Sequence, residues 1–175
     1  MDIKIRQETK DDFTEVFELV RRAFGQNDEA KLVDALRNNP TAFVPELSLV
    51  ATNDNNIVGH ILFTKIKITV DNVTEFDSLA LAPMAVKPDI QKKGIGGQLI
   101  RAGLDIARKL NFKSVMVLGH KHYYPKFGFK PASKWRIQSP FDVPTEVFMG
   151  IELIEGGLEN VSGTVNYPKE FDKFK

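Results

Sequence analysis

The N-terminal part of the chain changes its hydrophobic period once. Ile3–Arg6 alternates apolar and charged side chains, which is typical of a half-buried strand. Apolar side chains then recur at helical spacing over residues 13–24, and Gly25 can end that helix in a left-handed conformation. A second helical stripe runs up to Asn38-Asn39-Pro40. We therefore expect one strand followed by two helices.

Longer strands follow these helices. Leu47–Thr52 and Ile57–Val70 have the composition of strands, and so does Phe76–Val86. The turns between them, at residues 53–56 and 71–72, consist of Asn and Asp, which tolerate left-handed conformations. The pattern predicts three antiparallel strands in a meander at the centre of the sheet.

The stretch Leu79–Lys109 then changes its pattern twice. The near-continuous apolar run Leu79–Val86 suits a strand that is covered on both faces. Pro83 within it is expected at a bulge, or where the strand parts from a neighbour, because proline cannot donate to a sheet ladder. A glycine-rich segment follows at Gln91–Gly97, and from Gly97 on the apolar residues occupy one half of a helical wheel. The order is strand, glycine loop, amphipathic helix.

That order predicts an anion site. The first turn of a helix leaves backbone N–H groups without partners and carries partial positive charge. Glycines let a phosphate approach these amides closely, and Lys92 and Lys93 add positive charge beside the loop. Walker and dinucleotide-binding loops both need a glycine where this chain has Leu99, so neither pattern fits.

The pattern Gln-x-x-Gly-x-Gly-Gly at residues 91–97 resembles the pyrophosphate loop of the GNAT family of N-acetyltransferases, and Met84-Ala85-Val86 resembles the bulged central strand of that family. The resemblance implies an α/β fold with a mostly antiparallel central sheet, a splayed parallel strand pair and flanking helices. It also implies acetyl-CoA as co-substrate. The residues that would bind it are Met84, Ala85, Val86, Gln91, Lys92, Lys93, Gly94, Ile95, Gly96, Gly97 and Tyr124.

A second motif lies further along the chain. Phe112–Gly119 is expected to be a buried strand, joined to the previous one by a right-handed βαβ crossover. The aromatic segment that follows is expected to form a short helical turn that Gly128 ends. It resembles the Tyr-x-x-x-Gly-Phe segment of the family, in the branch that carries Tyr-Tyr-x-x-Phe-Gly-Phe. The resemblance makes Tyr124 the general acid for the CoA thiolate, and a phenol with a reference pKa of about 10 is protonated at neutral pH. The alternative is a core aromatic residue with its hydroxyl at the rim.

The sequence does not single out a general base. The open choices are a water molecule or one of four side chains, Glu29, Glu75, Asp77 and His120. His60 is expected to be an ordinary strand residue that faces solvent or a neighbouring strand. His120 and His122 have no carboxylate close to them in sequence, which is a poor metal signal, so we expect no metal.

Composition limits the remaining possibilities. A chain of 175 residues suits one domain over 1–175, with 135–175 as a C-terminal part on which the resemblance gives least help with mechanism. A net charge of +1 gives no electrostatic case for binding nucleic acid or a membrane. The chain has no cysteine, no signal peptide and no apolar run of about 18 residues, so we expect a cytoplasmic protein, either monomer or homodimer.

Together these features favour an acetyl-CoA-dependent N-acetyltransferase. It would transfer the acetyl group to a primary amine of a small molecule or protein, by direct attack in a ternary complex. The alternative hypothesis is a non-catalytic acyl-CoA-binding sensor or regulatory module. The acceptor and the oligomeric state do not follow from the sequence.

Overall fold

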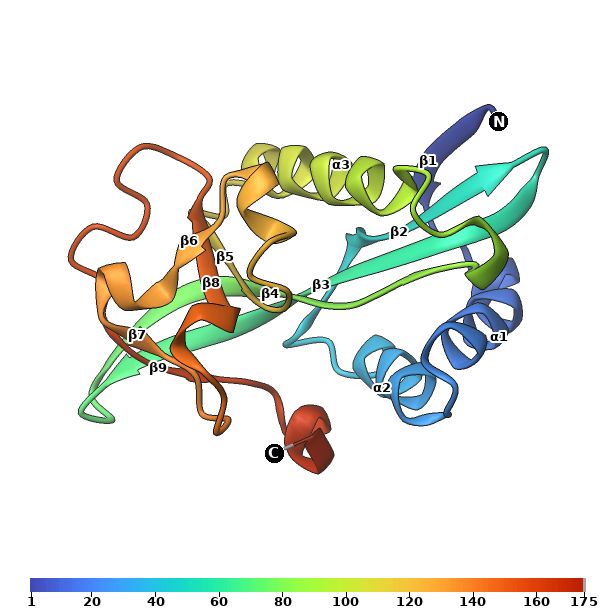
Figure 1. Ribbon diagram of the computed structural model, residues 1–175. Coiled ribbons are helices and arrows are strands. Elements are labelled where there is room, and N and C mark those ends of the chain that lie inside the picture. The colour runs from blue at the N-terminus through green and yellow to red at the C-terminus, as the bar shows by residue number, and fades with distance from the viewer. Residues whose placement is uncertain (175) are drawn as a thin grey trace. The chain divides into compact units, whose positions relative to one another are not determined.

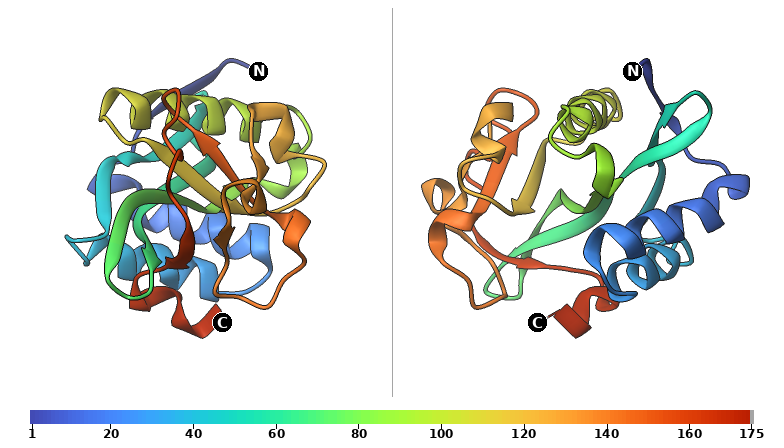
Figure 2. Two further views of the ribbon diagram at one scale, coloured as in Figure 1. Left: turned by 90° about the vertical axis from the view of Figure 1, so that its left-hand side faces the viewer. Right: turned by 45° about the vertical axis from the view of Figure 1, so that its right-hand side comes forward.

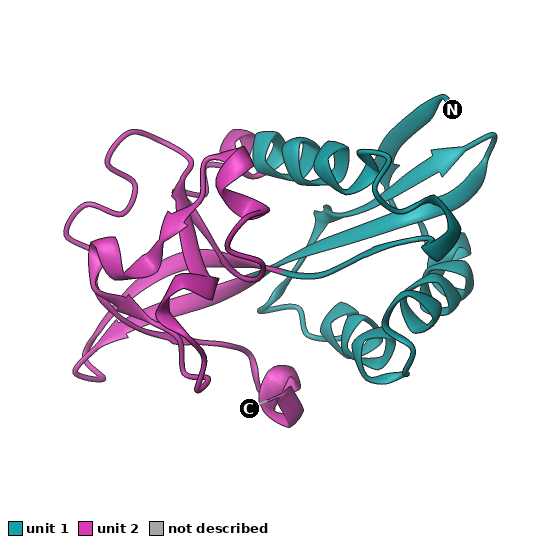
Figure 3. Ribbon diagram, in the orientation of Figure 1, with its two compact units in different colours: residues 1–64, 82–106 teal, residues 65–81, 107–175 magenta. Residues whose placement is uncertain are grey.

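The computed structural model describes residues 1–174, which form two compact units (Figure 3). Unit 1 takes residues 1–64 and 82–106, and unit 2 takes residues 65–81 and those from 107 on. Strands β3 (Asn56–Val70) and β4 (Thr74–Val86) and helix α3 (Ile95–Lys109) each run from one unit into the other. The expectation of a single domain over 1–175 stays a prediction.

Unit 1 is an antiparallel sheet with helices on both faces. Strand β1 (Ile3–Gln7) pairs with β2 (Phe43–Asn53), and β2 pairs with β3, in both cases antiparallel. Helices α1 (Phe13–Phe24) and α2 (Asp28–Arg37) lie on one face of these strands, and α3 lies on the other (Figure 1). The predicted order of one strand, two helices and antiparallel strands is confirmed.

Local sequence signals fix the ends of these elements. The Asp12 carboxylate accepts a hydrogen bond of 2.7 Å from the backbone N–H of Thr9, just before α1, and Gly25 ends that helix with φ 71°. In the β2–β3 turn, Asp54 and Asn55 have φ 49° and 65°. These are residue types that enter the left-handed region at little cost, so the predicted turn forms where they stand.

The two faces of β3 have different partners in unit 1. A Cβ added to Gly59 would lie 3.0 Å from Leu99 of α3, and a Cβ added to Gly103 of α3 would lie only 2.1 Å from the Phe63 ring. Side chains alternate along a strand, so His60 points to the opposite face. That second face is covered by a buried cluster from α1, α2 and the strands: Val16, Leu19, Val20, Ala30, Val50, Ile57 and Ala85.

Unit 2 contains the second half of β3, the first half of β4 and five further strands (Figure 2, left). These are β5 (Ser114–Leu118), β6 (Lys130–Pro131), β7 (Ile137–Gln138), β8 (Phe148–Glu152) and β9 (Gly163–Asn166). Strands β4 and β5 pair in parallel at Leu79 with Val115 and at Ala80 with Met116. Strand β8 is antiparallel to both β5 and β6, and β9 is antiparallel to β3 and parallel to β7.

These pairings confirm the predicted fold class: an α/β protein with a mostly antiparallel sheet, some parallel pairing and flanking helices. The β4–α3–β5 order is the expected βαβ unit. The splay of this strand pair stays a prediction. Pro83 lies within β4 after a cis peptide bond.

Several element boundaries differ from the predicted ones. Strand β2 begins at Phe43 rather than Leu47, and β4 begins at Thr74 rather than Phe76. Helix α3 begins at Ile95, two residues before the Gly97 at which its hydrophobic stripe becomes recognisable. Gly96 and Gly97 carry no side chain, so they hide the helical period of the first turn. Ile95 is 1% exposed and already belongs to the buried face of the helix.

Candidate active site

The glycine loop between β4 and α3 leads into a helix start with unpaired backbone amides. The first helical hydrogen bond runs from the Gln98 N–H to the Gly94 carbonyl, at 3.1 Å. The N–H groups of the three preceding residues, 95–97, therefore have no acceptor within the helix. Gly94 is exposed with φ 85°, and a Cβ added there would meet nothing within 4 Å. The space beside Gly94, at the start of α3, is thus free of side chains.

Lysines and a glutamine surround these amides. Gln91, Lys92, Lys93 and Gly94 are all exposed, and Lys92 adopts a left-handed conformation with φ 67°. The side-chain amide of Gln91 donates a hydrogen bond of 3.1 Å to the Val86 carbonyl. Gln91 therefore ties the loop to the end of β4, a role that the motif alone does not reveal.

The last residues of β4 alternate between two environments. Ala85 is buried in the cluster formed with α1 and α2, whereas Met84 and Val86 are half-buried. A ligand could therefore contact Ala85 only through its backbone, because its side chain is buried. The backbone N–H of Lys87 donates to the Val58 carbonyl at 2.8 Å, which fixes the end of the strand.

Tyr124 belongs to unit 2 and starts a short 3-10 helix, Tyr124–Phe127, which Gly128 ends with φ 104°. This confirms the predicted aromatic helical turn. The Tyr124 ring meets the rings of Tyr123 and Phe129 edge-on, with centroids 5.2 and 5.6 Å apart. Gly119 lies under the ring, since a Cβ there would be 2.3 Å from Tyr124 Cε2.

The hydroxyl of Tyr124 is largely buried and carries its proton at neutral pH. Burial, together with the neighbouring Tyr123, raises the pKa of Tyr124 to about 12, so the phenol stays protonated at neutral pH. The residue is 9% exposed, and within the described part of the chain its hydroxyl makes no hydrogen bond. A ligand can therefore be its partner.

Each of the four side chains considered as the general base either contacts another side chain or is exposed. Glu29 accepts a hydrogen bond of 2.9 Å from Gln26, and Asp77 forms an ion pair with Lys67. Glu75 is exposed. His120 is also exposed, and its Nδ1 accepts a hydrogen bond of 3.3 Å from the His122 N–H. None of these contacts marks one of them as the base.

Unit 1 contains a buried cluster of polar side chains that no sequence motif predicts. Glu8 and Arg37 are hydrogen-bonded, and His60 Nε2 lies 3.0 Å from Ser48 Oγ and 3.6 Å from the Glu8 carboxylate. His60 is 0% exposed, so of the two orientations considered it is the one toward a neighbouring strand that is confirmed. Burial lowers the pKa of His60, which favours the neutral ring.

Among residues 1–174, no group of three or more His, Cys, Asp and Glu side chains could hold a metal ion. Over the same range, no helix has the length and apolar composition needed to cross a membrane.

The strand end, loop and helix start at residues 84–97 indicate the same class of protein as a match to a protein-family model. Residues 4–132 match the model of the acetyltransferase (GNAT) domain. Because the match covers well over half of the chain, the protein belongs to the GNAT acetyltransferase family.

Particular relatives carry the same assignment. The chain is 40% identical to the uncharacterized N-acetyltransferase YjhQ of Escherichia coli K12 over 138 residues, 78% of this chain and 75% of YjhQ. The crystal structure of the Escherichia coli GNAT protein YhbS in complex with CoA superposes with a TM-score of 0.90, at 29% identity over 99% of this chain and 93% of that one. A GNAT acetyltransferase from Brucella melitensis in complex with acetyl-CoA gives a TM-score of 0.79, at 32% identity over 98% and 99% of the two chains.

Proposed function

We propose that this chain is an acetyl-CoA-dependent N-acetyltransferase that passes the acetyl group directly to a primary amine in a ternary complex. The observation that carries the proposal is the first turn of α3, where the unpaired amides of residues 95–97 follow an exposed loop with two lysines. Such amides bind phosphate groups through hydrogen bonds and the helix dipole. The YhbS and Brucella relatives were crystallised with CoA and with acetyl-CoA, which supports the choice of donor.

In the proposed complex, the loop from Gln91 to Gly97 holds the diphosphate of the donor. Lys92 and Lys93 add charge attraction at the rim of the site. The backbone of Met84, Ala85 and Val86 would bind the amides of the pantetheine arm and polarise the thioester carbonyl. The side-chain amide of Gln91 donates to the Val86 carbonyl, so a pantetheine amide that binds this carbonyl would compete with the hydrogen bond from Gln91.

The chemical step needs a proton acceptor and a proton donor. The amine nitrogen attacks the thioester carbon, the C–S bond breaks, and the sulfur leaves as a thiolate. Tyr124 would give its phenolic proton to that thiolate. A water molecule is the simplest acceptor of the amine proton, since Glu29 and Asp77 already bind neighbouring side chains and Glu75 and His120 lie in solvent.

Calorimetry separates the donor-binding step from the rest. CoA should bind, and pantetheine, which lacks the diphosphate, should bind at least about tenfold more weakly, because phosphate contacts with helix amides are charge-assisted. Equal binding of CoA and pantetheine would refute the role of the α3 amides. Release of free CoA from acetyl-CoA with a panel of primary amines then tests catalysis. Tight CoA binding without release for any amine would favour the sensor hypothesis.

A further inference from the structure

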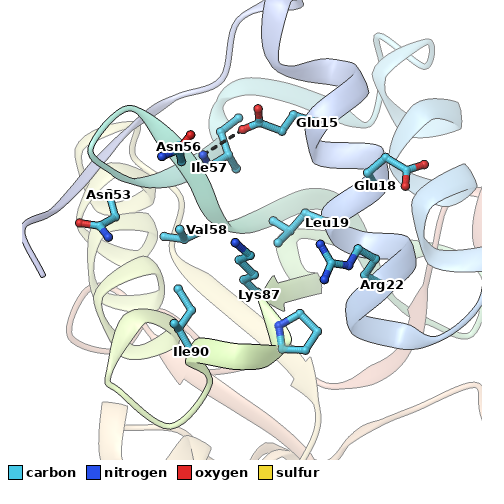
Figure 4. Close-up of a pocket in the computed structure, with 11 residues that line it drawn as sticks. Glu15, Glu18, Leu19, Arg22, Asn53, Asn56, Ile57, Val58, Lys87 and Ile90 are labelled. Carbon is cyan, nitrogen blue, oxygen red and sulfur yellow. Dashed lines mark hydrogen bonds between the residues drawn. The ribbon is translucent and has the colours of Figure 1, made fainter.

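A second pocket in unit 1 lies beside α1, outside the proposed donor-binding residues. It has a volume of about 350 Å³ (Figure 4). Its walls come from α1, from the two ends of the β2–β3 turn and from the segment that follows β4. The apolar part of the lining consists of Leu19, Ile57, Val58, Pro88 and Ile90. This volume is within the range of small-molecule sites.

Two cations of this pocket make no side-chain ion pair or hydrogen bond, and Arg22 acts on Glu18 only through its charge, which lowers the pKa of that carboxyl after the larger effect of Arg21. Arg22 and Lys87 line it, and neither forms an ion pair or a side-chain hydrogen bond with another described residue, apart from the backbone bond of Lys87 to Val58. In Figure 4 the Lys87 side chain extends into the middle of the lining residues, and the guanidinium of Arg22 turns toward the same side. Both charges are therefore available to a ligand.

The carboxylates in the lining are already used. Glu15 Oε2 accepts a hydrogen bond of 2.9 Å from the Ile57 N–H, which is the dashed line in Figure 4. Glu18 forms an ion pair of 2.7 Å with Arg21, one residue before Arg22 on α1. These two acids thus have hydrogen-bonded partners of their own, whereas the side chains of Arg22 and Lys87 form no hydrogen bond with a described residue.

We propose that this pocket binds a small organic anion whose carboxylate or phosphate head lies between Arg22 and Lys87. Its apolar body packs on Leu19, Ile57 and Val58. Arginine offers a planar fork that matches either head group, and lysine adds a point charge. The pocket wall at Lys87–Ile90 leads directly into Gln91, so this second site adjoins the proposed donor loop without sharing a residue with it.

Hexanoate and its neutral analogue hexanamide form a matched pair of probes. We expect hexanoate to shift the amide and methyl NMR signals of Leu19, Ile57 and Val58, with a dissociation constant on the order of 1 mM for so small a ligand. Hexanamide should bind at least about tenfold more weakly, because it lacks the charge that Arg22 and Lys87 recognise. Hexyl phosphate in place of hexanoate shows which head group is preferred. Equal shifts from the acid and the amide, or none from either anion, would overturn the proposal.

Substitutions of Arg22 and Lys87 test whether these two charges bind the anion. Arg22→Ala and Lys87→Gln should each weaken hexanoate binding by about tenfold, since each removes one of two ionic contacts. Neither side chain forms an ion pair or a hydrogen bond with another described residue, so both variants should keep the wild-type spectrum elsewhere. The matched control is Lys31→Ala, which removes an exposed cation of α2 that does not line the pocket. Binding that falls in the control as much as in Arg22→Ala would contradict the site.

Discussion

Arg37 holds the carboxylate of Glu8 with two hydrogen bonds, 2.9 Å from Nε and 2.8 Å from Nη2, where the two side chains are only 6% and 3% exposed. The guanidinium also lies 3.9 Å from the centroid of the Phe13 ring. The pair joins the end of α2 to the chain just after β1, and His60 and Ser48 complete the cluster. Unit 1 therefore contains an ion pair whose members were 29 residues apart in sequence and carried no motif.

Breaking the Glu8–Arg37 ion pair should lower the free energy of unfolding. In Arg37→Met the Glu8 carboxylate stays buried without its guanidinium, and loss of one partner of a buried pair costs about 3–5 kcal/mol of unfolding free energy. Urea unfolding at pH 7 measures the loss. The control is Asp34→Asn, which removes the other carboxylate that Arg37 binds, at 2.7 Å and 51% exposed. That variant should lose under about 1 kcal/mol, and equal losses in the two variants would refute the importance of burial.

The same cluster predicts a loss of stability in acid. Burial alone would raise the pKa of Glu8, but hydrogen bonds from His60 and Arg37 outweigh it and lower this pKa to about 2, from 4.5. Because the folded pKa is lowered, the stabilising effect of the Glu8 charge is complete above pH 4.5 and disappears as the pH falls toward 2. The difference in unfolding free energy between wild type and Glu8→Gln should shrink across this window. A difference that does not change with pH would contradict the assignment.

Tyr124→Phe tests the proposed general acid. Removal of the hydroxyl should lower kcat by about 10²–10⁴, the usual contribution of proton transfer, and leave CoA affinity nearly unchanged. Tyr123→Phe is the matched control, with the adjacent phenol removed. Since the pKa of Tyr124 is about 12, its ionisation should cause no fall in wild-type activity below pH 11. Unchanged kcat in Tyr124→Phe would remove this residue from the mechanism.

Gly119→Ala should act on Tyr124 indirectly. The new methyl carbon would lie 2.3 Å from Cε2 of the ring, so the ring must move. A displacement of about 1 Å at a reacting group can cost about 10² in rate. We expect kcat to fall with little change in CoA affinity by calorimetry, and a chemical-shift change confined to the aromatic segment. Normal kcat with a displaced ring would mean that the position of Tyr124 does not matter for turnover.

Thr64→Val should be neutral or stabilising, by up to about 1 kcal/mol. The buried hydroxyl of Thr64 makes no hydrogen bond within the described residues, and valine keeps its shape without the cost of an unpaired polar group. Ser78→Ala is the contrast, because the buried Ser78 hydroxyl lies 2.7 Å from Ser114 Oγ. That variant should lose about 1–3 kcal/mol. A clear loss in Thr64→Val by urea unfolding would show instead that an internal water binds the hydroxyl.

Sequence patterns predicted the elements well where the signal is local. Helix α1 ends at its glycine, the Asn and Asp turns form between the strands, and Tyr124 starts a short helical turn before Gly128. Each of these depends on the conformational preference of one or two residues. The start of α3 was missed by two residues because glycines carry no hydrophobic signal.

The sequence did not predict the contacts between residues far apart along the chain. The Glu8–Arg37 pair, the hydrogen bond from Gln91 to the Val86 carbonyl and the meeting of Arg22 with Lys87 in one pocket all depend on which elements pack together. The sites on the glycine loop and at Tyr124 came from motifs. The assignment of roles to those residues stays a prediction until ligands are tested.

The contact of Gly103 with Phe63 has a consequence for how this protein tolerates change. The phenyl ring occupies the volume that any side chain at position 103 would need. The helix that begins at residue 95 is thus packed against the Phe63 ring about two turns along its length. A screen that selects variants for acetylation would return glycine at position 103 for this packing reason, whatever the residue does in the reaction.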